Sequence, residues 1–541
     1  MAQHSWSERS VPAELVERYE REEWWTDNTL GGKVAEWLAA APDATVNIHS
    51  RSVEWHGTYA DIDDEARRLI ALLRAEGLEP GAIVAFQLPN WREAIVSFAA
   101  LTMGGYVLVP IVHIYGRKEV AFILAECGAD AYIAPASYGH VDYTAIVDEA
   151  APPGLRVHVV VGEGADQPAP DGIRRVGWDS LASFDPVTDL ATPRADEVAV
   201  LAYTSGTTSD PKGVIHDHRT MLSELRHMNG WVAGRATLMG SPVTHATGML
   251  GAVLGPLGRG GDMHVIDRWD PGHALEVMAA YDISGGTGAS IFLATLLDHP
   301  DFTPAHAANM ERVGLGGAPV PVELGRRAEG LGIKIIRAYG STEHPSTTGS
   351  QFDDPADQRH TTDGPVLPGV ELRLVDLDGA DVPAGVAGEI LSRGPELCLG
   401  YTNPTLNDAF DDDGWYHTGD IGIVDEHGCL TITDRVKDII IRGGENLSAA
   451  EIENAIAVVP GVAEVAVVAA PDARLGEHAC AVIRMSPGND PIELADLLPH
   501  LEAAGLARQK WPEEVRVVTD FPRTASGKVR KVDLRAALRE A

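Results

Sequence analysis

The chain has 541 residues, which is too long for one small hydrophobic core and predicts two or more domains. Hydrophobic residues make up 45% and charged residues 23% of the chain, an ordinary globular composition. Because 79 Asp and Glu residues outnumber 43 Lys and Arg residues, the formal net charge of −36 argues against nucleic acid and anionic membrane as the main partner.

The four cysteines lie far apart without CxxC spacing, which argues against a disulfide framework or zinc site and fits a reducing cytoplasm. The first 25 residues lack a basic start followed by an apolar core, so we expect no secretory signal. Residues 94–116 carry no charge and are long enough to span a membrane. Gly104, Gly105 and Pro110 interrupt this stretch, which favours a helix and a short buried strand over a membrane span.

Helix-like and strand-like patterns alternate over residues 59–135. Apolar residues recur at helical spacing over 59–75, and Gly77 follows as a natural C-cap. Strands are predicted at 82–88, 106–109 and 131–134, and helices at 91–102 and 118–127. This succession predicts a parallel sheet with crossover helices. The Pro- and Gly-rich stretch 151–172 predicts a surface loop.

The second half of the chain changes in character. An apolar strand at 198–203 leads into a Ser/Thr/Gly loop, and shorter strands at 370–375 and 388–392 indicate antiparallel pairing. After Arg435 the order is a strand at 439–442, a helix at 449–457, a strand at 462–469, a further helix and a basic tail. We therefore predict an α/β protein with a large N-terminal domain at 1–436, built of several subdomains with parallel sheets and a β-rich part, and a small α+β C-terminal domain at 437–541.

The strongest local signal is YTSGTTSDPKG, residues 203–213. Small hydroxyl residues and Gly206 after a strand can surround a polyphosphate with N–H groups and hydroxyls, and Lys212 adds a cation. The spacing does not match GxxxxGK[ST], which excludes an ordinary P-loop. Taken alone, the segment also fits a polar surface loop.

This segment resembles the phosphate loop of the adenylate-forming superfamily, which includes acyl- and aryl-CoA ligases, luciferases and peptide-synthetase adenylation domains. Further matches follow in the order of that family along nearly the full chain: RAYGSTE (337–343), WYHTGD (415–420), DRVKD (434–438), RGGEN (442–446) and PRTASGK (522–528). Each segment alone could arise by chance, but together they leave little room for another family. The pattern is most similar to acyl-CoA ligases, which implies ATP, Mg²⁺ and CoA as cofactors and an acyl-adenylate intermediate.

The resemblance implies a nucleotide site. Tyr339 would stack on adenine opposite a wall at 316–318, and Thr342 would contact the α-phosphate. Glu343, with Thr204, would hold Mg²⁺, a hard cation that prefers oxygen ligands. Asp420 would accept the ribose hydroxyls, and Arg435 would contact ribose or phosphate. Without the resemblance, Glu343 would be read as a surface carboxylate, and Asp420, which follows a glycine, as a turn residue. The implied nucleotide-binding set is Thr204, Ser205, Gly206, Thr207, Thr208, Lys212, Gly316, Gly317, Ala318, Tyr339, Gly340, Ser341, Asp420 and Arg435.

Lys528 is the implied catalytic lysine. Attack of a carboxylate on the α-phosphate brings two anions together, and an ammonium that bridges both stabilises the developing charge. In isolation, a lysine in a basic tail is normally solvated. Lys437 occupies the hinge position of the family, about which the mobile small domain would rotate. One pose would present Lys528, and the other would open a thiol tunnel beside the implied CoA-binding residues Arg442, Gly443, Gly444 and Glu445.

The segment SPVTHATG, residues 241–248, bears on the substrate. His245 stands where CoA-forming relatives place a catalytic residue beside the acyl carboxylate, although a lone histidine is often structural. Amino-acid-activating relatives place an Asp near here, and residues 241–244 offer none. We therefore expect a small carboxylic acid without an α-amino group, with glycines leaving room for a medium-chain or alicyclic acid. The implied acyl pocket comprises Thr244, His245, Gly248, Gly288 and Gly317.

Free CoA is the predicted thiol acceptor, and alternatives remain open. Loading of a carrier protein is one, and a silent nucleotide-binding protein, a simple ATPase and a kinase are others. Ser209 stands where the family usually has glycine, and serine is costly there if the loop needs a positive φ. In that case the enzyme would only transfer a preformed acyl-adenylate to CoA. The sequence leaves the oligomeric state open, a homodimer included.

Overall fold

The computed structural model describes residues 6, 8–139, 141–204, 210–231, 235–376, 378–442, 445–472, 474–504, 506–523 and 529–540. Packing divides the chain into two compact units, residues 1–371 with 392–416 and residues 372–391 with 417–541. The predicted domain boundary at 436/437 was placed at the hinge about which the small domain would rotate, and it stays a prediction.

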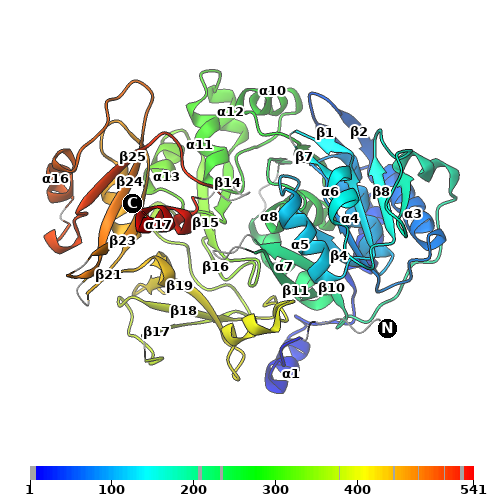
Figure 1. The fold of residues 1–541 in the computed structure, drawn as a ribbon, viewed down its shortest axis with the longest axis horizontal. Helices are drawn as coiled ribbons and strands as arrows, with labels where there is room; N and C mark the ends of the chain where they lie inside the picture. Colours follow the sequence, from blue (N-terminus) through cyan, green and yellow to red (C-terminus); the bar gives the residue numbers. More distant parts are fainter. Residues whose placement is uncertain are drawn as a thin grey trace. The chain divides into compact units, whose positions relative to one another are not determined.

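The largest sheet of the first unit is mostly parallel. In the described part of the chain its strand order is β11 (Lys212–Asp217), β10 (Val198–Thr204), β4 (Val107–Pro110), β3 (Ile83–Phe86), β5 (Ala131–Pro135), β8 (Val157–Val161) and β9 (Arg174–Gly177). Neighbouring strands are parallel except β10 and β11, which form an antiparallel hairpin. Crossover helices α3 (Tyr59–Ala75), α4 (Arg92–Met103) and α5 (Arg117–Cys127) connect or flank these strands (Figure 1).

The predictions for residues 59–135 are confirmed. Helix α3 begins at a capping box, in which Thr58 and Asp61 exchange side-chain and backbone hydrogen bonds. Gly77 follows its end with a φ of +80°, a conformation that glycine adopts without strain. Helix α4 ends before β4, and no helix among the described residues is long and apolar enough to cross a membrane.

The prediction of a loop over 151–172 is wrong in its middle. Residues 157–161 form β8, which is buried along its whole length between β5 and β9. The prolines and glycines on both sides dominate the composition, whereas the short apolar run VHVVV fits a buried parallel strand.

Two smaller sheets of the first unit also bear on the site. One has the order β12 (Leu238–Met239), β13 (Met263–Ile266), β1 (Thr45–His49) and β2 (Trp55–Thr58), and the other β14 (Arg312–Gly316), β15 (Lys334–Tyr339) and β16 (Thr348–Gly349). A short hairpin joins β6 (Ser137–Tyr138) to β7 (Val141–Asp142). The other helices of this unit are α1 (Ala13–Arg21), α2 (Leu30–Ala40), α6 (Tyr143–Ala150), α7 (His218–Trp231), α8 (Ala246–Gly248), α9 (Gly255–Arg259), α10 (Pro271–Tyr281), α11 (Ser290–Asp298), α12 (Pro304–Asn309), α13 (Val322–Gly330) and α14 (Ala356–Thr361). Short 3₁₀ segments lie at Trp178–Ser183 and Pro404–Ala409.

The second unit combines two sheets. The first has the order β17 (Glu371–Val375), β18 (Gly388–Arg393), β19 (Tyr416–Val424) and β20 (Leu430–Arg435). The second has the order β22 (Glu445–Leu447), β21 (Ile440–Arg442), β24 (Gly476–Met485) and β23 (Val462–Asp472), and β25 (Glu514–Val518) pairs with β24. Helices α15 (Ala449–Ala457), α16 (Leu494–Ala503) and α17 (Lys531–Glu540) complete it, with 3₁₀ turns at Val436–Asp438 and Arg508–Lys510. The predicted fold class is confirmed.

Candidate active site

The predicted phosphate loop connects β10 and β11. Thr204 pairs with Lys212 and Tyr203 with Gly213, so the hairpin places Thr204 and Lys212 on either side of the loop. Glu126 of α5 accepts hydrogen bonds from the hydroxyl of Tyr203 and from Oγ1 of Thr402, the latter at 2.8 Å. The base of the hairpin is therefore held by a carboxylate that the sequence analysis missed. The predicted ligands Ser205, Gly206, Thr207 and Thr208, and the departure at Ser209, lie outside the described residues.

A tight turn follows β15. A Cβ on Gly340 would lie 1.9 Å from the carbonyl oxygen of Pro345, so only glycine fits between Tyr339 and the turn. Ser341 N donates to His344 O at 2.9 Å, and His344 N donates to Ser341 Oγ at 3.2 Å. These bonds close the turn that carries Thr342 and Glu343, the predicted contacts of phosphate and Mg²⁺.

A buried histidine, His216, also holds this turn in place. Nε2 of His216 donates to the carbonyl oxygen of Thr342 at 2.8 Å. Burial lowers the pKa of His216 to about 4, so the ring is neutral near pH 7 and carries its proton on Nε2. The orientation of Thr342 is thus set by β11, the strand that carries Lys212.

Glu343 lies in a buried position with one firm partner. It is 9% exposed, and the hydroxyl of Tyr401 donates to its Oε1 at 2.7 Å. The ammonium of Lys212 lies 5.6 Å from the centre of the Tyr401 ring. Burial, and next the charge of Glu343, raise the pKa of Tyr401 far above its usual value, so the phenol keeps its proton. Tyr401 therefore connects the predicted phosphate cation with the predicted metal carboxylate.

Backbone pairing brings Tyr401 to this place. Ile215 N of β11 donates to Gly400 O at 2.9 Å, and Thr402 N donates to Gly213 O at 2.8 Å. Tyr401 follows Glu343 by 58 residues, and no local spacing in the sequence links the two. Tyr401 therefore could not be recognised from the sequence.

The predicted adenine wall lies at the end of β14. Gly316 pairs with Ala338 in the parallel β14–β15 ladder, one residue before Tyr339. Gly317 has a φ of +72°, and a Cβ there would meet Oγ1 of Thr247 at 3.8 Å. The structure therefore brings Gly317 beside the segment that follows His245.

Asn90 fixes the loop that carries Thr244 and His245. Its Nδ2 donates to Ser241 O at 3.0 Å and to Ile266 O at 3.1 Å, and its Oδ1 accepts from Val243 N at 2.7 Å. This buried amide was not singled out in the sequence because it lies more than 150 residues away. His245 itself caps α8, since its Nδ1 accepts from Thr247 N at 3.4 Å. A π-helical turn at Met249–Leu254 follows, a feature often found near functional sites.

The explanation offered for Gly248 is corrected. A Cβ there would lie 1.9 Å from the carbonyl oxygen of Pro242, so glycine permits close backbone packing and leaves no open space. Gly288 differs, because a Cβ there would meet the Ser241 hydroxyl at 3.0 Å and the Phe292 ring at 3.5 Å. Aromatic rings thus border the predicted acyl region, and Trp269 packs on Phe292 with ring centres 4.6 Å apart.

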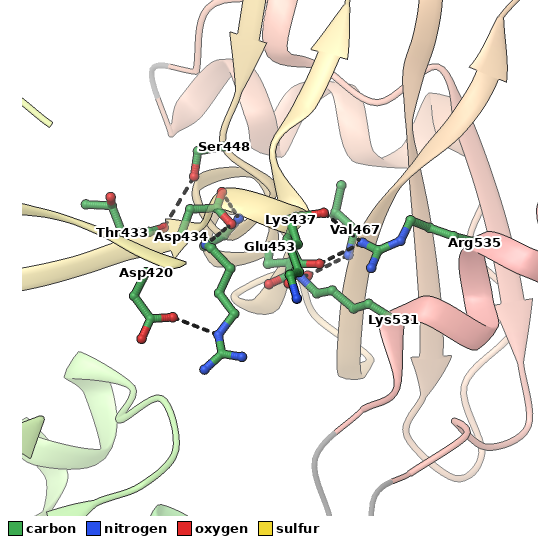
Figure 2. A network of polar contacts seen from close by, with 12 residues as sticks. Asp420, Thr433, Asp434, Lys437, Ser448, Glu453, Val467, Lys531 and Arg535 are labelled. Carbon is green, nitrogen blue, oxygen red and sulfur yellow. Dashed lines mark hydrogen bonds and ion pairs between the residues drawn. The ribbon is translucent and has the colours of Figure 1, made fainter. Parts of the chain in front are cut away.

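Asp420 and Arg435 meet in the second unit. They are paired residues of the antiparallel strands β19 and β20, and Nε of Arg435 lies 2.7 Å from Oδ1 of Asp420 (Figure 2). Asp420 is buried, whereas Arg435 is exposed. The predicted ribose acceptor is therefore fixed by the arginine that was predicted to contact ribose or phosphate.

The residues after the predicted hinge Lys437 are anchored to helix α17. Arg535 Nη1 lies 2.6 Å from Oδ1 of Asp438, and Lys531 Nζ lies 2.8 Å from Oε1 of Glu453 (Figure 2). Burial raises the pKa of Glu453 although Lys531 acts in the opposite direction.

Contacts that join the two sides of Lys437 are longer. Ser448 Oγ donates to Thr433 O at 3.4 Å, and Ala450 N donates to Asp434 Oδ2 at 3.5 Å (Figure 2). Ile439 N also donates to Arg435 O across this position, at 3.2 Å, and the hinge at Lys437 stays a prediction.

The remaining predicted residues are placed only in part. Arg442 pairs with Glu445 across the β21–β22 hairpin. Gly443, Gly444 and the catalytic candidate Lys528 lie outside the described residues.

The oxygen donors present fit Mg²⁺ better than a transition metal. The carboxylate of Glu343 and the hydroxyl of Thr204 are hard ligands, and Mg²⁺ is usually held by one or two carboxylates together with substrate phosphates. Within the described ranges there is no cluster of three or more His, Cys, Asp or Glu side chains suited to a metal. An ion carried in by a nucleotide is compatible with this arrangement.

Comparison with known proteins identifies the family. The model of the AMP-binding enzyme family matches residues 34–402, and that of the AMP-binding enzyme C-terminal domain matches residues 451–528. The chain therefore belongs to the AMP-binding enzyme family of adenylate-forming enzymes, as its motifs predicted.

Individual relatives agree over most of their length. A medium-chain fatty-acid–CoA ligase of Escherichia coli K12 is 33% identical over 531 residues, covering 96% of this chain and 92% of the relative. A CoA ligase of Mycobacterium tuberculosis, named for a methyl-dioxo-octahydroindenyl propanoyl group, is 35% identical over 489 residues, with coverages of 88% and 93%. The crystal structure of ATP-bound MatB from Rhodopseudomonas palustris superposes with a TM-score of 0.82 at 28% identity, covering 94% of this chain and 99% of MatB.

Proposed function

We propose that the protein is an acyl-CoA ligase that converts a carboxylic acid, ATP and CoA to acyl-CoA, AMP and pyrophosphate. A carboxylate oxygen of the acid attacks the α-phosphorus, and pyrophosphate leaves. The sulfur of CoA then attacks the acyl carbonyl, its proton is released, and AMP leaves. The observation that carries the proposal is the arrangement of Lys212, Tyr401 and Glu343, which places a cation and a fixed carboxylate beside the phosphate hairpin.

The first half-reaction is assigned to polar groups with separate tasks. Lys212 neutralises phosphate charge, and Thr342 contacts the α-phosphate from the closed turn. Glu343 and Thr204 hold Mg²⁺, which when bound neutralises phosphate oxygens. Lys528 supplies the ammonium that bridges carboxylate and α-phosphate. This division accounts for the firm positions of Thr342 and Glu343.

The second unit is assigned nucleotide orientation and domain alternation. Asp420 accepts the ribose hydroxyls, and Arg435 orients it through their 2.7 Å contact. Rotation about Lys437 then exchanges Lys528 for the CoA-binding hairpin Arg442–Glu445.

The substrate is proposed to be an apolar acid without an α-amino group. No carboxylate occurs at positions 241–244, and aromatic rings at Trp269 and Phe292 border that loop through Gly240. The names of the E. coli and M. tuberculosis relatives indicate medium-chain and alicyclic acids, and both suit such surroundings. His245 is assigned to the acyl carboxylate.

A panel of carboxylic acids with ATP, Mg²⁺ and CoA tests the proposal, with acyl-AMP, acyl-CoA and pyrophosphate measured by mass spectrometry. We expect medium-chain or alicyclic acids to give acyl-CoA with stoichiometric pyrophosphate, and amino acids to give neither. Release of ADP or phosphate would indicate a kinase or ATPase. Conversion of supplied acyl-AMP to acyl-CoA without any acid-dependent pyrophosphate release would indicate the transfer-only alternative. Acyl-AMP that reacts with a carrier protein and not with CoA would indicate carrier loading.

A further inference from the structure

A buried charged cluster lies behind the turn that carries Thr342 and Glu343. We call Glu396, His227 and His344 the Glu396 cluster; all three side chains are at most 2% exposed. His227 comes from α7, His344 closes the turn after Glu343, and Glu396 lies two residues before Cys398, whose N–H donates to Glu343 O at 2.8 Å. The cluster therefore adjoins the metal-binding turn on two chain segments.

The contacts within the cluster are close. Nε2 of His227 and Nε2 of His344 lie 3.1 Å and 3.5 Å from Oε1 of Glu396. Nδ1 of His344 lies 2.8 Å from Oγ of Ser392, which fixes the ring from its other side. Gly394 leaves no spare room, because a Cβ there would lie 2.8 Å from His344 Nε2 and 3.1 Å from Glu396 Oε2.

Two imidazole rings are close polar neighbours of Glu396. Neither of its carboxylate oxygens accepts an aligned hydrogen bond from the described part of the chain. Burial alone would raise the pKa of Glu396, but the contacts with His227 and His344 outweigh it and lower the pKa to about 2. Glu396 is therefore a carboxylate at neutral pH.

A second buried glutamate nearby has the opposite state. Burial, and next the charge of Glu396, raise the pKa of Glu224 well above its usual value and so favour its protonated form. Its Oε1 accepts a hydrogen bond from Ser346 Oγ at 2.6 Å. The Trp24 ring lies 5.3 Å from that of His227. Two glutamates of equal size thus occupy one buried region, with pKa values shifted in opposite directions.

We propose that Glu396 is a positioning residue for acid activation: its carboxylate holds His227 and His344 and thereby fixes the Ser341–His344 turn that presents Thr342 and Glu343. This inference rests on the proposed function. Burying a charge costs free energy that apolar packing would avoid, so the carboxylate is better explained by the geometry it imposes than by stability. Misplacement of a catalytic group by about 1 Å can cost on the order of 10²-fold in rate.

Glu396→Gln and its matched control Glu224→Gln test the proposal, since both keep side-chain size. Glu396→Gln should lower kcat for acid-dependent pyrophosphate release about tenfold and raise the Mg²⁺ concentration needed for half-maximal rate. Formation of acyl-CoA from supplied acyl-AMP should stay within about twofold, because that step does not use Glu343. Glu224→Gln changes a carboxyl group that burial disposes to the neutral form, and it should stay within about twofold in every assay.

Unfolding of the ligand-free protein tests the role of Glu396 independently of enzyme activity. Urea unfolding at pH 7 should show a lower midpoint for Glu396→Gln, because two imidazoles lose their charged partner, and no lower midpoint for Glu224→Gln. If Glu396→Gln does not fold, Ser392→Ala, which removes the other contact of the His344 ring, should slow pyrophosphate release in the same direction.

Two outcomes would overturn the inference. Equal effects of Glu396→Gln and Glu224→Gln would show that the carboxylate charge is irrelevant, and equal loss in both half-reactions would show general damage. Absence of pyrophosphate release in the unmodified enzyme with every acid would instead refute the proposed function, and the urea comparison would still test the charge assignment.

Discussion

The substitution Tyr401→Phe removes one hydroxyl. It tests how Glu343, the proposed metal-binding carboxylate, is held in place. The phenol of Tyr401 donates to Oε1 of Glu343 at 2.7 Å inside the first unit. Phenylalanine keeps the ring, and with it the contact to Phe410 at 5.9 Å and the position of Lys212 over the ring at 5.6 Å. The substitution therefore isolates the hydrogen bond.

The expected size follows from the charge and burial of Glu343. A hydrogen bond to a charged group contributes about 1.5–3 kcal/mol, and Glu343 is too buried for water to replace the bond freely. Since about 1.4 kcal/mol corresponds to a tenfold change in rate, adenylation should fall about 10- to 100-fold if the whole loss reaches the transition state. The hydroxyl of Tyr416 lies farther from that of Tyr401, at 3.4 Å, so Tyr416→Phe should cost less than about threefold.

Acid-dependent pyrophosphate release and single-turnover acyl-AMP formation measure the effect, each at several Mg²⁺ concentrations. Formation of acyl-CoA from supplied acyl-AMP serves as the internal control and should be nearly unchanged. Equal losses for Tyr401→Phe and Tyr416→Phe would refute the reasoning. A lower Mg²⁺ requirement in Tyr401→Phe would also refute it, because the hydroxyl would then be competing with the ion for Glu343.

Three further changes have defined outcomes. Lys528→Ala should lower acyl-AMP formation by roughly 10²-fold, measured by pyrophosphate release, while transfer from supplied acyl-AMP survives far better; equal loss in both would contradict its role. Lys437→Pro fixes φ near −65° and should let acyl-AMP accumulate while acyl-CoA formation falls; an unchanged rate of acyl-CoA formation would exclude residue 437 as the pivot. Burial lowers the pKa of His49 to about 3 and of His264 to about 4, so the unfolded state binds more protons and the free energy of unfolding should fall as pH drops from about 6.5 to 4. Urea unfolding between pH 7 and 4 should show a shallower fall for His264→Gln, and an unchanged slope would contradict the assignment.

The parts of the fold that the sequence predicts are those with a strong local pattern. The helix over 59–75 combines apolar spacing, a capping box and a following glycine, so three signals agree with the tertiary structure. The strand at 157–161 has a clear apolar run, but its prolines and glycines on both sides resemble a loop until β5 and β9 enclose it. Short buried strands are therefore difficult to predict from composition when prolines and glycines flank them.

The predicted site residues were recognised from sequence motifs. The residues that hold them in place could not be recognised in this way. Glu126, Tyr401 and Asn90 act across 58 to 276 residues of sequence, through backbone pairing that no local pattern encodes. Glu224 and Glu396 carry the same side chain, and only burial and two neighbouring imidazoles separate their protonation states. Electrostatic roles of this kind depend on the folded environment and are not properties of the residue type.

Among the described residues, few hydrogen bonds cross Lys437, the proposed pivot of a domain rotation. Two hydrogen bonds across the proposed pivot, from Ser448 and Ala450, have lengths of 3.4 and 3.5 Å, and a third, from Ile439 N to Arg435 O, has a length of 3.2 Å. Bonds of that length contribute at most about 0.5–1 kcal/mol each, so their loss costs on the order of 2 kcal/mol. A ligand that binds one pose about 30-fold more tightly than the other offsets such a cost. In the proposed mechanism, the exchange of pyrophosphate for an acyl group would therefore need to change the relative affinity of the two poses by about this factor.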